Sequence, residues 1–325
     1  MTIKLYYDKF SVMKKILIIL FLMSFVFVSN GYSFWIWTPK SGKWVNPKYS
    51  VKQNPKEHFD YAMGFYNKKS LKRAIAEFRR LIKNYSDAYE AAEAQFYIGK
   101  SFEGLRKDYE AYKAYQLVID KYPFNKRHEE IIRIEYDIAE RFISNRDKSK
   151  FLGLNFQLED PAVEIFKKIE ENSPYSKLAA KSIYRLGVYL KAKELFIEGQ
   201  KEFENLLDKY PNSEWVEPAR FQLAECLALI SPEAEYSQNI TQEAREKFED
   251  FAQEHPEAIL GESARIKVRE LKEKEAESNF IIAQFYEKQK DFESAKIYYN
   301  YVIDNYPESD FVVKALEGIK EIDKK

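Results

Sequence analysis

The residues best suited to chemistry are few and far apart in this sequence. Its 325 residues include three histidines, His58, His128 and His255, and one cysteine, Cys226. Histidine and cysteine are common general bases, nucleophiles and metal ligands, but these four have no metal-ligand spacing. The sequence also has no glycine-rich phosphate loop and no Gly-x-Ser-x-Gly elbow. We therefore predict that the protein is not an enzyme and has no catalytic residue, metal site or cofactor.

Charged side chains are abundant but balanced, with 52 basic and 52 acidic residues. They alternate in runs such as Lys272-Glu273-Lys274-Glu275, a pattern typical of a solvated helix face. Because there is no net basic field, we predict no nucleic-acid partner. Cys226 lies within an apolar helical pattern, where we expect it to be a small buried residue.

The remaining candidates for function are rings and cations that could line a surface. One aromatic residue recurs in each of six similar segments: Phe59, Phe96, Tyr136, Tyr184, Phe221 and Phe280. Together with nearby cations, the first three could hold an extended peptide that ends in an aromatic residue and a carboxylate. The predicted peptide groove comprises Phe59, Met63, Tyr66, Phe96, Lys100, Arg133 and Tyr136. Alternatively, the rings pack against the neighbouring segment, since large aromatic side chains are usually mostly buried.

A repeat of about 34 residues positions these side chains. Ala283 is followed at fixed offsets by Tyr286, Ala295, Tyr299, Val302 and Pro307, and the same offsets recur from Gly99 and from Gly187. Small residues at two of these offsets let two antiparallel helices pack closely, which is the tetratricopeptide pattern. It predicts an all-α, right-handed solenoid of about six helical hairpins over residues 57–325. The hairpins are expected near residues 57–86, 94–123, 131–174, 181–211, 219–256 and 275–307, followed by a capping helix.

Two of these hairpins carry insertions between their helices. The third hairpin has eleven extra residues, which are apolar around residues 151–156 and are expected to fold onto the solenoid. Asp160 and Pro161 should then restart a helix. The fifth hairpin has eight extra residues, after which Thr241 is expected to cap the second helix.

The N-terminal segment differs from the repeats. Residues 1–33 have a basic start, an apolar run of 13 residues and small residues before a cleavage point, and they predict a signal peptide. A retained anchor is the alternative, and the start is either Met1 or Met13. Residues 34–56 predict an extended Trp/Pro-rich arm. Its rings should dock on the first repeats, on a partner or at a membrane interface: Trp35, Trp37 and Trp44.

Residues 266–318 resemble the BamD family, the tetratricopeptide subunit of the outer-membrane β-barrel assembly machinery. The resemblance is carried by Ala283-x-x-Tyr286, by Ala295-x-x-x-Tyr299 and by the ending Tyr306-Pro307-x-Ser309. It implies a non-catalytic periplasmic scaffold, peripheral to the inner face of the outer membrane at most. The implied partners are the barrel-assembly channel protein, through the C-terminal repeats, and nascent outer-membrane proteins, through the N-terminal groove.

The chain departs from that family in two respects. The family is normally anchored through a lipidated N-terminal cysteine and usually has five repeats. Here no such cysteine follows the predicted signal peptide, and an additional repeat is expected, which indicates a non-lipidated variant. A cell-envelope adaptor of the cell-division or Tol–Pal type, which shares the Tyr-Pro-x-Ser ending, is the alternative function.

Overall fold

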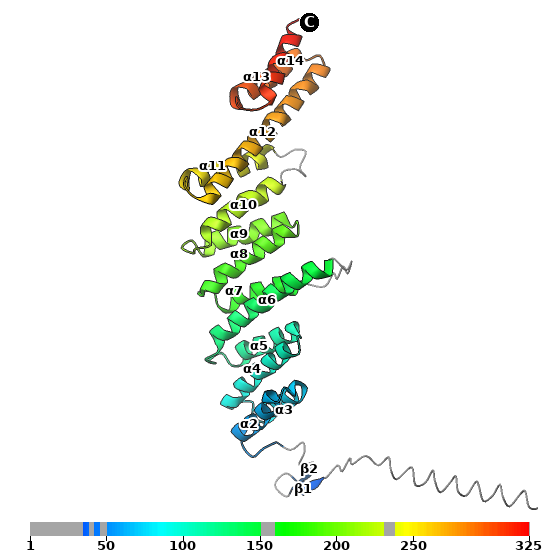
Figure 1. Ribbon diagram of the computed structural model, residues 1–325, viewed down its shortest axis with the longest axis vertical. Helices are drawn as coiled ribbons and strands as arrows, with labels where there is room; N and C mark the ends of the chain where they lie inside the picture. Colours follow the sequence, from blue (N-terminus) through cyan, green and yellow to red (C-terminus); the bar gives the residue numbers. More distant parts are fainter. Residues whose placement is uncertain (1–34, 39–41, 46–50, 151–159, 231–237, 325) are drawn as a thin grey trace, which may run out of the picture. The chain divides into compact units, whose positions relative to one another are not determined.

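The computed structural model describes residues 35–38, 42–45, 51–150, 160–230 and 238–324 (Figure 1). The predicted signal peptide, the apolar insertion and most of the insertion in the fifth hairpin lie outside these residues. The described chain forms tetratricopeptide hairpins, the all-α fold that the sequence predicts, preceded by one short β-ribbon. It divides into two compact units, residues 1–94 and 95–325, and each is described by itself.

The first unit holds the ribbon and one complete hairpin. Strands β1 (Ile36–Thr38) and β2 (Lys43–Val45) pair antiparallel, so the predicted arm contains a hydrogen-bonded ribbon that its prolines did not indicate. Helix α2 (Pro55–Asn67) then packs on α3 (Leu71–Asn84). The α2 helix begins at Pro55, two residues before the predicted repeat, because the Asn54 side chain accepts a hydrogen bond from the amide of Glu57 at 2.8 Å.

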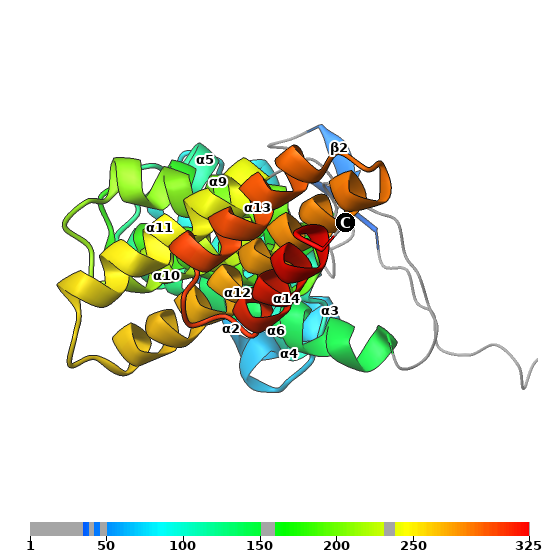
Figure 2. The same cartoon turned by 90° about the horizontal axis from the view of Figure 1, so that it is seen from above.

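Helices of the second unit pack in chain order, each against the next, and α4 (Tyr89–Gly104) enters this unit from the first. The five hairpins pair α4 with α5, α6 with α7, α8 with α9, α10 with α11, and α12 with α13. The remaining bounds are α5 (Asp108–Lys121), α6 (His128–Lys150), α7 (Pro161–Asn172), α8 (Lys177–Ala192), α9 (Phe196–Lys209), α10 (Val216–Ile230), α11 (Gln238–Glu254), α12 (Ile259–Lys288), α13 (Phe292–Asn305) and α14 (Phe311–Ile322). Both views show α12, α13 and α14 side by side (Figures 1 and 2).

The small residues of the repeat lie where the two helices of a hairpin cross. A Cβ atom added to Gly99 would lie 2.4 Å from the ring of Tyr115, and one added to Gly187 would lie 2.7 Å from the ring of Phe203. In both cases the ring stands sixteen residues after the glycine and is fully buried. Glycine is therefore needed at these positions for packing, because any larger side chain would displace a core ring.

The structure corrects two predictions about the inserted segments. Helix α6 runs to Lys150, so the third hairpin begins its insertion as helix rather than as loop. Asp160 caps α7 as expected, since its carboxylate accepts a hydrogen bond from the amide of Ala162 at 3.1 Å. Thr241 does not cap a helix: α11 starts at Gln238, and Thr241 is buried within it.

Candidate interaction surfaces

The recurring aromatic residue of the first helix in each hairpin contacts an aromatic residue of the second helix. The ring centroids lie 5.5–6.0 Å apart in all six hairpins, and the ring planes are tilted or edge-on. The six pairs are Phe59–Phe78, Phe96–Tyr115, Tyr136–Phe166, Tyr184–Phe203, Phe221–Phe248 and Phe280–Tyr299. Each of these rings thus packs within its own hairpin. Some also pack on the segment that follows, as the sequence indicated: Tyr184 contacts Trp215, and Phe280 contacts Phe311.

The predicted groove residues of the second unit differ in how deeply they are buried. Phe96 and Tyr136 are only 2% and 8% exposed, so their rings belong to the hydrophobic core. Lys100 is half-buried and lies 3.6 Å from the carboxylate of Glu103, while Arg133 is exposed on α6. The two cations are therefore the parts of this set that a ligand could reach.

In the first unit, Phe59, Met63 and Tyr66 are all half-buried on α2. The Phe59 ring packs on Phe78, and the ammonium of Lys69 lies 6.0 Å from the centre of the Tyr66 ring. These three residues and the four of the second unit are in different units, so a single groove made of all seven stays a prediction.

The predicted arm contacts are at the surface of the first unit. Trp35, Trp37 and Trp44 are 57%, 49% and 65% exposed. Trp37 and Trp44 are directly opposite each other across the two strands. The docking of these rings on the first repeats, on a partner or at a membrane interface stays a prediction.

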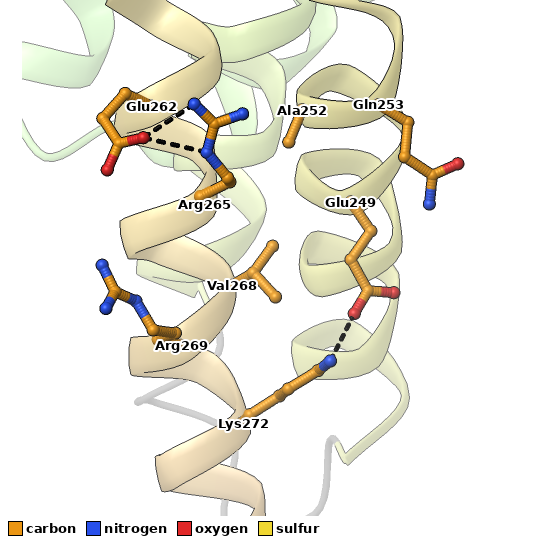
Figure 3. A pocket seen from close by; sticks show the side chains of 8 residues that line it. All are labelled: Glu249, Ala252, Gln253, Glu262, Arg265, Val268, Arg269 and Lys272. Carbon is orange, nitrogen blue, oxygen red and sulfur yellow. Dashed lines mark hydrogen bonds and ion pairs between the residues drawn. The ribbon is translucent and has the colours of Figure 1, made fainter. Parts of the chain in front are cut away.

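A pocket of about 570 Å³ lies between α11 and α12 (Figure 3). Its floor is apolar, since Ala252 of α11 and Val268 of α12 lie between the two helices. Three cations of α12 line it, spaced so that they share one helical face: Arg265, Arg269 and Lys272.

Two of these cations are held by carboxylates and one is not. Arg265 pairs with Glu262 at 2.7 Å, and Lys272 reaches across to Glu249 of α11 at 3.0 Å (Figure 3). Arg269 is exposed and has no ion-pair partner among the described residues. The pocket can therefore accept an apolar side chain and, at its edge, a negative charge.

A second pocket, of about 380 Å³, lies among α11, α12 and α13. Three tyrosines and one isoleucine form one wall of it: Tyr298, Tyr301, Tyr306 and Ile297. Ile297 and Tyr301 are 66% and 46% exposed. Burial, with the Glu275 carboxylate nearby, raises the pKa of Tyr306.

An ion-pair chain joins the two pockets. Lys272 pairs with Glu249, Glu249 with Arg245 at 2.9 Å, and Arg245 with Glu275 at 3.1 Å. Glu275 is only 7% exposed, so the last residue of the run Lys272-Glu273-Lys274-Glu275 is buried, whereas its composition indicated a solvated face. The missed signal was the spacing of Arg265, Arg269 and Lys272, which places three cations on one side of a helix.

The described residues offer neither a metal site nor a membrane-spanning helix. No group of three or more His, Cys, Asp and Glu side chains among them could hold a metal ion. None of the described helices has the length and apolar character needed to cross a membrane. Cys226 is fully buried in α10, and burial raises the pKa of its thiol to about 11.

Comparison with known families places both pockets within one family domain. The model of the YfiO family, described as "Outer membrane lipoprotein", matches residues 160–325, which is 166 of 325 residues. The chain belongs to the YfiO family. This domain starts at the N-cap of α7 and includes α7 to α14, so it is longer than the resemblance over residues 266–318 that the sequence motifs indicated.

A tetratricopeptide model matches residues 93–125, the α4–α5 hairpin that precedes the YfiO domain. A comparison with curated proteins found no match. Among solved structures, the C-terminal part of a repeat protein from Cytophaga hutchinsonii is 17% identical, covers 82% of this chain and 88% of its own, and has a TM-score of 0.34. PilF of Pseudomonas aeruginosa is 13% identical, covers 83% and 96%, and has a TM-score of 0.28. At these scores, neither structure bears on function.

Proposed function

We propose that this chain is a protein-interaction scaffold in outer-membrane protein assembly, acting on the periplasmic side without catalysis. The observation that carries the proposal is the surface of α11, α12 and α13, where two pockets flank one ion-pair chain inside the YfiO domain. Tetratricopeptide hairpins typically present such surfaces to extended or helical segments of other proteins. We name this surface the junction surface, defined by the residues that line the two pockets.

The junction surface favours a partner segment of defined chemistry. Ala252 and Val268 can accept an apolar side chain, and Arg269 provides a cation that has no ion-pair partner within the described part of the chain. A segment with apolar residues on one side and a carboxylate beside them would match both features. We assign this contact to the barrel-assembly channel protein, and we assign nascent outer-membrane proteins to the N-terminal groove around Lys100 and Arg133.

Affinity purification of the tagged protein from gently solubilised envelopes, with partners identified by mass spectrometry, tests the proposal. The wild-type protein should recover an outer-membrane β-barrel protein with periplasmic domains. Arg269→Glu should lose it, because the variant places a like charge against the partner carboxylate. Lys201→Glu on α9 is the matched control, since Lys201 is exposed and lines neither pocket.

Two results would contradict the assignment. Recovery of Tol–Pal or cell-division proteins by the wild-type protein would make the adaptor function the better one. Equal recovery of the barrel protein by the Arg269→Glu and Lys201→Glu variants would place its contact elsewhere on the chain. Arg133→Glu tests the groove separately, and it should reduce recovery of nascent outer-membrane proteins while leaving the channel protein bound.

A further inference from the structure

The β-ribbon gathers tryptophan side chains on one face. Trp37 and Trp44 are directly opposite each other in the antiparallel pair, and opposed residues project to the same face of a ribbon. Trp35 stands two residues before Trp37, a spacing that returns to that face in an extended chain. All three side chains are about half exposed or more. We name strands β1 and β2, together with Trp35, the tryptophan ribbon.

The three exposed indole rings indicate that the tryptophan ribbon binds another molecule or a membrane. Strands of three residues are too short to be stable alone, and large apolar rings are seldom left together in water. Indole has an apolar body and one polar N–H group, so tryptophan is enriched where hydrocarbon meets water at a membrane surface.

The positive charge of residues 34–56 indicates what kind of membrane surface the ribbon fits. Residues 34–56 contain five lysines and no acidic residue, although the whole chain has equal numbers of basic and acidic residues. A lysine near an anionic lipid surface contributes about a fivefold gain in partitioning. Rings together with uniform positive charge are complementary to a bilayer that contains anionic lipid.

We propose that the tryptophan ribbon binds the surface of a membrane that contains anionic phospholipid. The indole rings enter the headgroup region, and the net positive charge of residues 34–56 attracts this segment to lipid phosphates. The ribbon thereby holds the chain peripherally at a bilayer, independently of the partner that the junction surface binds. A protein or glycan ligand of the ribbon is the competing outcome of the test.

Tryptophan fluorescence with vesicles of phosphatidylethanolamine and phosphatidylglycerol carrying brominated acyl chains tests this proposal. The chain has four tryptophans, and none lies in residues 1–33. The fourth, Trp215, packs on Tyr184 with ring centroids 4.8 Å apart. A Trp215→Phe variant should therefore be strongly quenched by the bromine. A variant with Trp35→Phe, Trp37→Phe and Trp44→Phe, which keeps only Trp215, should not be quenched.

Vesicle co-sedimentation of residues 34–325, the chain without the predicted signal peptide, gives the second readout. The triple variant Trp35→Ser, Trp37→Ser and Trp44→Ser should bind anionic vesicles at least about tenfold more weakly than wild type, with an unchanged helical circular dichroism spectrum. Phe124→Ser and Tyr175→Ser are the matched controls and should bind as wild type does, because both side chains are fully exposed outside the ribbon. Binding should also be weaker in high salt and on phosphatidylcholine vesicles.

The proposal is overturned if the Trp215→Phe variant is not quenched, or if the triple serine variant binds anionic vesicles as well as wild type does. Equal binding to phosphatidylcholine and to anionic vesicles would also overturn it. So would capture of the ribbon by a soluble protein or glycan without any vesicle binding. Because these measurements use only lipid and purified protein, their failure leaves the junction-surface proposal untouched.

Discussion

The ring pairs inside the hairpins and the junction surface use the same helices in opposite ways. The ring pairs repeat six times at nearly constant distance, and each buries its hydrophobic area within one hairpin. The junction surface combines residues of α11, α12 and α13, and the ion pairs that line its first pocket are partly solvated. The contrast is between packing that recurs in every hairpin and stabilises it, and one local surface to which we assign recognition.

The largest expected change in stability comes from removing one ring of a ring pair. Phe203→Ala on α9 should lower the free energy of unfolding by about 3–5 kcal/mol, because the fully buried ring leaves a cavity beside Tyr184. Denaturant unfolding followed by helical circular dichroism measures it. Ile197→Ala on the same helix is the control, since Ile197 is 54% exposed and should change stability by less than about 1 kcal/mol. Equal losses would mean that the ring pairs do not stabilise the fold.

A buried carboxyl group in α6 should make stability depend on pH. Glu135 is fully buried, and among the residues that the structure describes only one of its carboxylate oxygens has a hydrogen-bond partner, the Gln116 side-chain amide at 2.8 Å. Burial raises the pKa of Glu135 to about 8, whereas an unfolded glutamate titrates near pH ~4.3. The folded protein therefore binds more protons between these values, and its stability should fall as the pH rises through this window.

The variant Glu135→Gln removes that titration. Wild type should lose about 3–4 kcal/mol of stability between pH 5 and pH 8 from this group, and the variant should not. The two proteins should be similar at pH 5, because glutamine resembles the protonated acid in shape and polarity. Denaturant unfolding at both pH values measures the difference. Parallel pH profiles for the two proteins would show that Glu135 is ionised in the folded state.

Two helical glycines test whether close packing at the helix crossings requires glycine. Gly99→Ala should destabilise the protein by about 1–3 kcal/mol, since its Cβ would lie 2.4 Å from the Tyr115 ring. Gly64→Ala is the matched control, because a Cβ there meets nothing within 4 Å. That change should be neutral or stabilise by up to about 1 kcal/mol through helix propensity. Thermal melts of both variants compare them, and a stabilised Gly99→Ala protein would exclude crowding at the crossing.

The smallest effect is expected at the junction surface. Lys272→Gln removes the ion pair with Glu249 and should change the free energy of unfolding by less than about 1 kcal/mol, because both side chains are partly solvated. A double-mutant cycle with Glu249→Gln measures the coupling between the two residues. A coupling of several kcal/mol would make the ion-pair chain a structural element, like the ring pairs, rather than part of a recognition surface.

The sequence predicted the fold where the repeat itself determines the packing. Gly187 and Phe203 recur at a fixed offset because one must lie under the other, and such local contacts can be recognised without a structure. The capping helix that the sequence predicts after the sixth hairpin is α14, Phe311–Ile322, whose apolar residues keep the helical period.

The sequence could not predict features that depend on distant neighbours. The burial of Glu275 depends on Arg245, thirty residues earlier on another helix, so its alternating charges indicated a solvated face. Ribbon pairing was missed for a similar reason: prolines exclude a long helix, but they do not show that Trp37 lies opposite Trp44. Arg269 became a candidate only through the pocket between α11 and α12, which it helps to line.

Site-specific photocrosslinking in living cells tests the central claim most directly. A photoreactive amino acid would replace Arg269 in the junction surface and, in a matched strain, Lys201 on α9. We expect position 269 to crosslink an outer-membrane β-barrel protein with periplasmic domains and position 201 to give no such product. Equal products from both positions, or products at position 269 that contain only Tol–Pal or division proteins, would contradict the account.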